Sequence, residues 1–437
     1  MMTRLLTGWA EEDFTPEPGL TLMGQMHERR GERMRDPLMA SAMAVADSES
    51  TVVLVSVDIC MLSTGFVRET QTEYARLSGL PAGHLLIHAT HTHVAPTEIT
   101  LLASTADPTF VERVRTAILQ ASFRALAGLQ LSDVFAGAGH MDEMGWNRRG
   151  MFGDGSSAMY GGAGSPGFVG LEGPRDPTLG VVFSRDLEGH ILGVVVNFST
   201  HPNTLENECF YSADIPGEVR RVLKQLLGPE VVIAYLTGAA GNTAPSILDR
   251  PVPTQPWRGE EGLMRSGLYL GGEVARVIAA STEPMAEPVL RLASSTLSIP
   301  VRPWPAPEDP SYPRPLVDGS WASARSYYEA AMAGWGERLE RESPVGVRVH
   351  SVRIGDAALC TSPAELFVEY GLKIREGSPA RVTLVAELTD GYVGYVPTQL
   401  AFERGGYETW PAPSSQLVPE AGEEIAGAAK AMLGQLF

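Results

Sequence analysis

Residues 85–96 read LLIHATHTHVAP, an apolar segment that runs directly into two histidines, His91 and His93. The segment Thr51–Ile59 (TVVLVSVDI) precedes it, and its apolar, β-branched residues are typical of a buried central strand. A helical pattern over Phe66–Leu77 separates the two segments. Two strands joined by a helix predict an α/β fold. They also place the histidines at the carboxyl end of a strand, where open α/β sheets bind ligands.

Strands and helices alternate along the rest of the chain. A short connection at 186–189 joins two of the later strands as a hairpin, so parallel and antiparallel pairs should occur together. We therefore expect a mixed β-sheet flanked by helices, and no internal repeat is apparent. The other predicted strands are Leu85–Ala89, Gly180–Arg185, Ile191–Ser199, Val231–Leu236, Val289–Ile299, Val347–Ile354, Ala357–Cys360 and Val382–Leu388. The other predicted helices are Pro108–Leu126, Pro216–Leu227, Glu260–Ala280, Ala322–Arg341 and Glu420–Leu436.

Two stretches break this alternation. Residues 150–173 are rich in glycine and serine, which predicts a surface loop, and a lid over an active site is one interpretation of it. Residues 300–315 are rich in proline. Because strands resume after this stretch, we interpret it as a traverse within one domain that spans residues 1–437.

Composition and charge restrict the partners. Lys and Arg number 34 against 52 Asp and Glu, and a net charge of -18 argues against nucleic acid and against anionic membrane surfaces. No run of about 18 apolar residues predicts a membrane span, and residues 1–19 lack the apolar core of a signal peptide. Three scattered cysteines favour a reducing compartment. We expect a cytoplasmic protein with a small-molecule substrate and no membrane insertion; a homo-oligomer stays open.

Histidines follow two of the predicted strands. In an extended chain, side chains at positions i and i+2 share a face, so His91 and His93 can converge on one metal ion. The alternative interpretation is a pair of hydrogen-bonded core histidines. His201 directly follows a second apolar strand and is fixed by Pro202. The two histidine segments therefore end in the same way, at the strand ends that line the ligand crevice.

Two more strands end in polar groups. Asp58 closes the first strand, and Asn242 ends the segment TGAAGN at 237–242. The glycines of this segment resemble a phosphate-binding loop, but its Lys-Ser/Thr ending is missing. We interpret it as a small loop at the floor of the site.

Several short segments, in order along the chain, resemble the neutral/alkaline non-lysosomal ceramidase family. Residues 89–96 (ATHTHVAP) resemble the family's ATHTHSGP segment, and residues 197–202 (NFSTHP) resemble its histidine segment after the next strand. The remaining matches are MG at 23–24, VD at 57–58, GWNRR at 145–149, SAD at 212–214, SPAE at 362–365 and DGYVGYVPT at 390–398. Each match is short, but together they cover most of the chain.

The resemblance implies a zinc-dependent amide hydrolase. Carried over by position, the zinc ligands are His91, His201, Glu365 and Tyr392. His93 is then the general acid or base, and Arg148 binds the scissile carbonyl or its oxyanion. We further expect Asp58, Asn242 and Tyr395 to contact the substrate. Two imidazoles, a carboxylate and a phenolate form a nitrogen and oxygen ligand set that suits zinc and leaves room for water.

The sequence also departs from the family. Ala244 stands where ceramidases carry a serine proposed to assist catalysis. The acidic chain has no evident route to a membrane lipid, so we expect hydrolysis of a C–N amide bond in a soluble small molecule. An ester or lactone hydrolase is the first alternative, because the same oxyanion chemistry serves both. The second alternative is a non-catalytic homologue that binds a metal or ligand.

Overall fold

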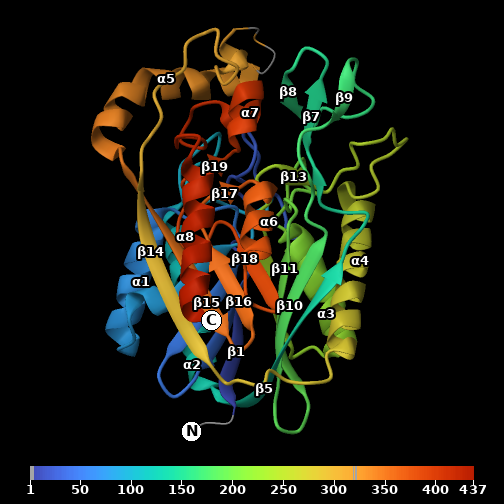
Figure 1. Ribbon diagram of the computed structural model, residues 1–437, viewed down its shortest axis with the longest axis vertical. Helices are drawn as coiled ribbons and strands as arrows, with labels where there is room; N and C mark the ends of the chain where they lie inside the picture. The colour runs from blue at the N-terminus through green and yellow to red at the C-terminus, as the bar shows by residue number, and fades with distance from the viewer. Residues whose placement is uncertain (1–3, 318, 320–321) are drawn as a thin grey trace.

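The computed structural model describes residues 4–317, 319 and 322–437, which fold into two stacked β-sheets between two layers of helices (Figure 1). The larger sheet has eight strands in the order β12-β11-β10-β5-β1-β2-β3-β4, and the smaller has four in the order β14-β15-β16-β18. Parallel and antiparallel pairs occur in both. The predicted α/β fold with a mixed sheet flanked by helices is therefore confirmed.

The larger sheet consists of two halves with the same connections. In the first half three antiparallel strands are followed by a helix and a fourth strand parallel to the third: β1 (Leu5–Asp13), β2 (Met39–Ala46), β3 (Thr51–Val57), α1 (Thr64–Ser78) and β4 (Leu85–Ala89). The second half repeats this order with β5 (Gln130–His140), β10 (Thr178–Arg185), β11 (Ile191–Phe198), α3 (Asp214–Leu227) and β12 (Val232–Thr237). The halves join where β1 pairs with β5.

The smaller sheet is a third copy of the same unit. It contains β14 (Leu290–Ile299), β15 (Val345–Ile354), β16 (Ala357–Thr361), α6 (Val368–Glu376) and β18 (Val382–Ala386). A helix closes each unit: α2 (Pro108–Ala127), α4 (Gly259–Ala280) and α8 (Ala421–Leu436). The described part of the chain thus holds three βββαβα units, a repeat that the sequence does not reveal.

Side chains of alternating direction build the core on both faces of the larger sheet. On β3, Val53 and Val55 pack against α2, whereas Val52 and Leu54 face the smaller sheet. Leu359 and similar residues of the smaller sheet complete the layer between the sheets. A strand buried on both faces needs a continuous apolar run, and this is the pattern that made β3 recognisable in the sequence.

A long insertion separates the first and second strands of every unit, at residues 14–38, 141–177 and 300–344. The second contains the Gly/Ser-rich stretch, which forms a three-stranded sheet of β7 (Arg149–Phe152), β8 (Ser157–Met159) and β9 (Phe168–Leu171). Our prediction of a loop there was wrong, because Gly155 and Gly167 adopt positive φ and allow the strands to reverse. The proline-rich residues 300–315 lead into α5 (Ala322–Glu342), and in Figure 1 α5 and β7–β9 lie at the same end of the molecule.

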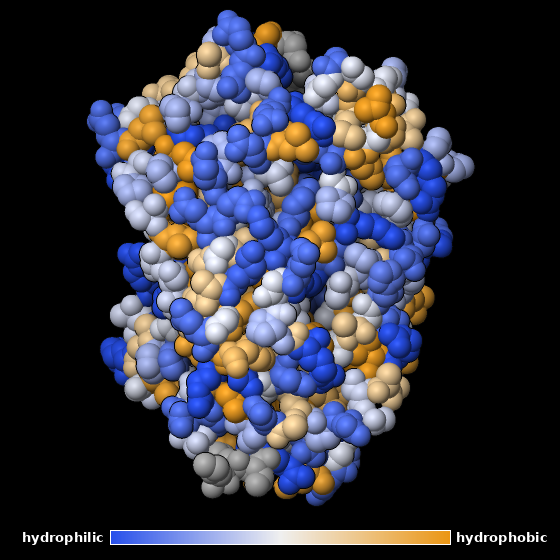
Figure 2. Space-filling view, in the orientation of Figure 1, coloured by the Kyte–Doolittle hydropathy of each residue, from blue (hydrophilic) through white to orange (hydrophobic). Residues whose placement is uncertain are grey.

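Some elements were not predicted. β2 (MASAMAVA) and β5 are rich in alanine or glycine, which favour strands little, and pairing within the sheet outweighs that propensity. Short elements also line the site end: β6 (Trp146–Asn147), β13 (Thr243–Ala244), β17 (Glu365–Leu366), β19 (Tyr395–Val396) and α7 (Gln399–Arg404). Among the described helices, none combines the length and apolar character needed to cross a bilayer. On the face drawn in Figure 2, apolar residues lie interspersed among hydrophilic ones.

The contact of β1 with α2 gives a test of this packing. A Cβ at Gly8 would lie 2.0 Å from the carbonyl oxygen of Ala125. Because Ala125 belongs to helix α2, its backbone cannot move aside without distorting the helix. We expect Gly8→Ala to lower the free energy of unfolding by about 2 kcal/mol or more. Gly427→Ala on α8 meets no atom within 4 Å and should raise it by about 0.5–1 kcal/mol. Calorimetric unfolding midpoints that move together, rather than in opposite directions, would contradict this packing.

Candidate metal centre and adjoining cavity

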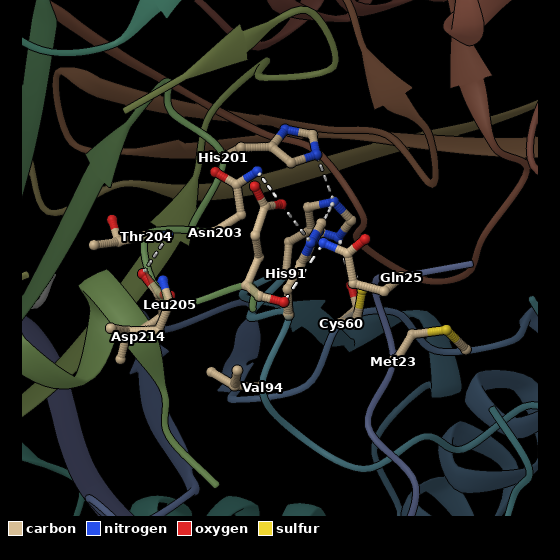
Figure 3. A network of polar contacts seen from close by, with 12 residues as sticks. Met23, Gln25, Cys60, His91, Val94, His201, Asn203, Thr204, Leu205 and Asp214 are labelled. Carbon is tan, nitrogen blue, oxygen red and sulfur yellow. Dashed lines mark hydrogen bonds and ion pairs between the residues drawn. The ribbon is translucent and has the colours of Figure 1, made fainter. Parts of the chain in front are cut away.

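Three buried side chains converge where strands of the three units end. His91 follows β4, His201 follows β11 and Glu365 follows β16, so each unit contributes one of them. The two Nε2 atoms lie 3.0 Å apart, and Glu365 Oε2 lies 3.3 Å from the first and 3.6 Å from the second. Figure 3 shows the rings of His91 and His201 turned toward each other. Sequence positions as far apart as 91 and 365 are thereby joined in one cluster.

Backbone carbonyls fix which ring nitrogens face the cluster. The Nδ1 atom of His91 lies 2.7 Å from the carbonyl oxygen of Cys60, and that of His201 lies 2.8 Å from the carbonyl oxygen of Ala240. Because a carbonyl oxygen only accepts, each Nδ1 carries a hydrogen, and each Nε2 is left as the nitrogen that can bind a cation. Glu365 Oε2 has no hydrogen-bond partner of its own. Three electron-rich atoms that face one another fit a divalent cation.

The two imidazoles of the cluster differ in charge. Burial lowers the pKa of His91, but the neighbouring Cys60 and Glu365 outweigh it and raise this pKa well above its ordinary value. Burial, with the Arg148 guanidinium nearby, lowers the pKa of His201 well below its ordinary value, so the ring is neutral as a metal ligand must be. Burial raises the pKa of Glu365, but the neighbouring His91 and Arg148 outweigh it and hold the pKa below its ordinary value. Protonated His91 and ionised Glu365 therefore form a buried ion pair beside the neutral His201, and a cation that binds there would replace the His91 proton.

Cys60 and Tyr392 lie beside the cluster in different ways. The Sγ atom of Cys60 is 3.5 Å from Nδ1 of His91, on the side of the ring that already donates to a carbonyl, so the thiol does not share the cation position. The Tyr392 hydroxyl donates to Glu365 Oε1 at 2.9 Å. Burial raises the pKa of Tyr392 well above its ordinary value, which keeps the phenol protonated in this arrangement.

His93 lies next to the cluster, as we predicted, but the backbone that places it there is not extended. We expected His91 and His93 to converge because an extended chain places them on one face. Instead the chain leaves the extended conformation at His91, which has a φ of 70°, and His93 lies in the turn that follows. Their Nε2 atoms nevertheless lie 3.4 Å apart. Burial lowers the pKa of His93 to about 4, so its ring is neutral near pH 7.

Arg148 is held in place by a buried ion-pair network. Its Nε donates to Glu408 Oε1 at 3.0 Å, and its Nη2 donates to the Tyr395 hydroxyl at 3.1 Å. The neighbouring Arg149 donates to the other oxygen of Glu408 at 2.7 Å and to Glu172. Two buried arginines share Glu408, so the Arg148 guanidinium stays charged and fixed in direction.

A cavity of about 550 Å³ opens beside His93 and Arg148. All three insertions contribute to its wall, together with segments that follow β11 and β18. Its lining residues are Gly24, Gln25, Met26, His27, His93, Arg148, Met159, Tyr160, Asn203, Glu206, Asn207, Ala322, Ser323, Ala324, Tyr395 and Tyr407. Its size suits a small molecule.

This chain resembles known proteins in fold rather than in overall sequence. No family profile and no curated protein matches the chain. The crystal structure of neutral ceramidase from Pseudomonas aeruginosa aligns with a TM-score of 0.77 over 100% of this chain and 75% of that chain, at 18% identity. A structure described as a ceramidase complexed with C2 aligns with a TM-score of 0.76 over 100% and 76%, at 17% identity.

The chain has the fold of neutral ceramidase. The resemblance first seen in short sequence segments is thus confirmed for the fold. Within this neutral ceramidase fold, Ala244 is buried on β13 and pairs with Trp146, where it has no group to offer a substrate.

The three residues expected to contact the substrate have different places in the neutral ceramidase fold. Tyr395 lines the cavity, whereas Asp58 and Asn242 do not. Asp58 accepts from Arg220 at 2.7 Å and from the Met39 amide at 2.9 Å. Asn242 binds Glu369 and Val368 on α6, and its carbonyl oxygen accepts from the Arg148 amide. In this structure Asp58 and Asn242 therefore hold strand ends and loops outside the cavity wall, and contact of the three residues with a substrate stays a prediction.

Glu206 and Glu408 were not among the predicted site residues. Glu206 lies on the segment after β11, and Glu408 lies between α7 and α8 in the third βββαβα unit. A buried pair such as Arg148-Arg149 requires carboxylates, and this requirement was the one available signal. The requirement for a carboxylate does not tell which of the 52 Asp and Glu residues pairs with the two arginines.

Substitution of the converging residues tests the metal centre. We expect the chain, equilibrated with zinc and then dialysed, to retain about one ion per chain, and His91→Ala, His201→Ala or Glu365→Ala to remove most of it. His190→Ala is the matched control, because His190 belongs to an exposed cluster with Asp186 and Glu188 that could also hold an ion. Metal content is measured by plasma mass spectrometry. Loss of the ion in His190→Ala alone would refute the buried centre.

Proposed function

We propose that this chain is a zinc-dependent hydrolase that cleaves a C–N amide bond in a small molecule. The observation that carries the proposal is the convergence of two imidazole Nε2 atoms and a carboxylate oxygen that accepts no hydrogen bond, beside a cavity that also presents His93 and Arg148. The fold likeness to ceramidases supports a hydrolase. The nitrogen and oxygen donor set favours zinc over Mg²⁺ or Ca²⁺, which prefer oxygen ligands alone.

His91, His201 and Glu365 would hold the zinc ion, with Tyr392 as a fourth ligand if its hydroxyl leaves Glu365 Oε1. The chemistry that zinc supplies in such sites is polarisation of a carbonyl and activation of water near pH 7. The carbonyls of Cys60 and Ala240 orient the two imidazoles from behind. Such supporting hydrogen bonds fix ring direction and raise ligand basicity.

Arg148 would stabilise the oxyanion that forms when the amide carbonyl is attacked. Its charge is fixed by Glu408, and its Nη2 bonds Tyr395, which shares the cavity wall. A preorganised cation of this kind contributes most in a site that excludes water, because it does not have to reorient during the reaction. Tyr395 would meet the substrate next to it.

His93 would carry the proton from the attacking water to the leaving nitrogen. Its neutral ring can accept a proton, and its Nε2 faces the metal cluster. An amide needs this step more than an ester, since an amine leaves only when it is protonated. Cytoplasmic placement belongs to the same proposal and is supported by three unpaired cysteines.

A substrate screen tests the function. The zinc-loaded chain is assayed against matched N-acyl amides, aryl esters and lactones, with His93→Gln and the metal-free chain as controls. We expect turnover of at least one amide, lost on zinc removal. Turnover of esters or lactones with no amide cleaved would favour the ester alternative. Zinc binding with no turnover of any class would favour a non-catalytic homologue.

Gly24 gives a test of how His93 is placed. Gly24 has a φ of 102°, and a Cβ there would lie 2.5 Å from Cγ of the His93 ring. We expect Gly24→Ala to displace the ring and lower kcat/KM about 100-fold while zinc stays bound. Gly19→Ala is the control, since Gly19 has a φ of 120° but no atom within 4 Å of its Cβ position. Equal losses in the two variants would show that backbone strain, and not the ring contact, is responsible.

A further inference from the structure

Glu206 lies on the side of His93 that faces away from the metal cluster. Its Oε2 is 3.7 Å from Nδ1 of His93, and this nitrogen has no hydrogen-bond partner. The opposite nitrogen of the ring, Nε2, is the one that lies 3.4 Å from His91 Nε2. Glu206 is therefore the acidic group that faces the rear of the ring.

Glu206 is itself fixed by its neighbours. Its Oε1 forms an ion pair with Arg258, and its Oε2 accepts from Asn203 Nδ2 at 2.9 Å. The same Asn203 amide donates to the Tyr160 hydroxyl at 2.8 Å, which sets its direction. Figure 3 shows the Asn203 side chain beside the imidazole rings of His91 and His201. The carboxylate is thus held beside the ring and cannot turn into the solvent without breaking these contacts.

The ring and the backbone of His93 are also held by neighbours other than Glu206. Gly24 packs directly against the ring, and Arg29 donates to the His93 carbonyl oxygen at 2.7 Å. Ring and backbone are therefore both restrained. With its position fixed, the remaining freedom of His93 is the choice of which nitrogen carries the hydrogen.

From this geometry we infer that Glu206 is a positioning residue, which holds the His93 hydrogen on Nδ1 and leaves the Nε2 lone pair toward the metal cluster. The inference deepens the proposed function, on which its kinetic part rests. A ring with the hydrogen on Nε2 could not accept a proton at the position where water is activated. Carboxylates fix the tautomer of catalytic histidines in this way in other hydrolases.

The kinetic test compares substitutions at two neighbouring carboxylates in the zinc-loaded chain. We expect Glu206→Ala to lower kcat about 100-fold with KM within about twofold and zinc content unchanged. Glu206→Gln, whose amide oxygen can also face Nδ1 as an acceptor, should recover at least about tenfold of that loss. Glu208→Ala is the control, because Glu208 is an exposed carboxylate on the same segment. Equal kcat values for Glu206→Ala and Glu208→Ala would overturn the inference.

The tautomer is measured independently of any activity. In ¹⁵N-histidine-labelled, metal-free protein, long-range ¹H–¹⁵N correlation spectra report which ring nitrogen is protonated, and His93→Gln identifies the signal. We expect the Nδ1–H form in the wild-type chain and a shift toward Nε2–H in Glu206→Ala. A wild-type Nε2–H form, or an unchanged tautomer in Glu206→Ala, overturns the inference. Failure to hydrolyse any amide would overturn the proposed function while this spectrum still decides the role of Glu206.

Discussion

Three electron-rich atoms that face one another at the ends of strands are the constraint on which the structure of this site depends. The Nε2 atoms of His91 and His201 lie 3.0 Å apart with a carboxylate oxygen of Glu365 beside them, all buried. A buried carboxylate needs a positive charge beside it, and either a proton on His91 or a metal ion between the three atoms supplies that charge. The remaining features of the site position these atoms or shape the space beside them.

The threefold repetition of the βββαβα unit explains how distant residues meet. Each unit ends its parallel strands at the same end of the molecule, so one ligand from each unit can reach a common point. The long insertion between the first two strands of each unit contributes residues to the wall of the cavity beside that point. The segments at the strand ends thus carry the candidate metal-binding groups, and the insertions form much of the cavity wall beside them.

The features that could be predicted from the sequence are those that depend on residues close together along the chain. Apolar β-branched runs such as Thr51–Val57 and histidines directly after strands marked both the sheet and the cluster, and the order of short segments added Glu365 and Arg148. Contacts between distant residues could not be predicted in this way. Asp58 follows a strand, as a site residue would, yet its partner Arg220 stands 162 residues away and draws it into a structural pair. The alanine-rich strand β2 likewise depends on its neighbours in the sheet rather than on its own propensity.

The central claim, that the three units share a single metal ion, is tested most directly by zinc-edge anomalous diffraction and X-ray absorption on crystals of the zinc-loaded chain. The account predicts one buried anomalous peak between the Nε2 atoms of His91 and His201 and the carboxylate of Glu365, with nitrogen and oxygen neighbours at about 2.0–2.2 Å. A sulfur neighbour at about 2.3 Å, which would implicate Cys60, or a peak only at the exposed Asp186, Glu188 and His190 cluster would contradict it.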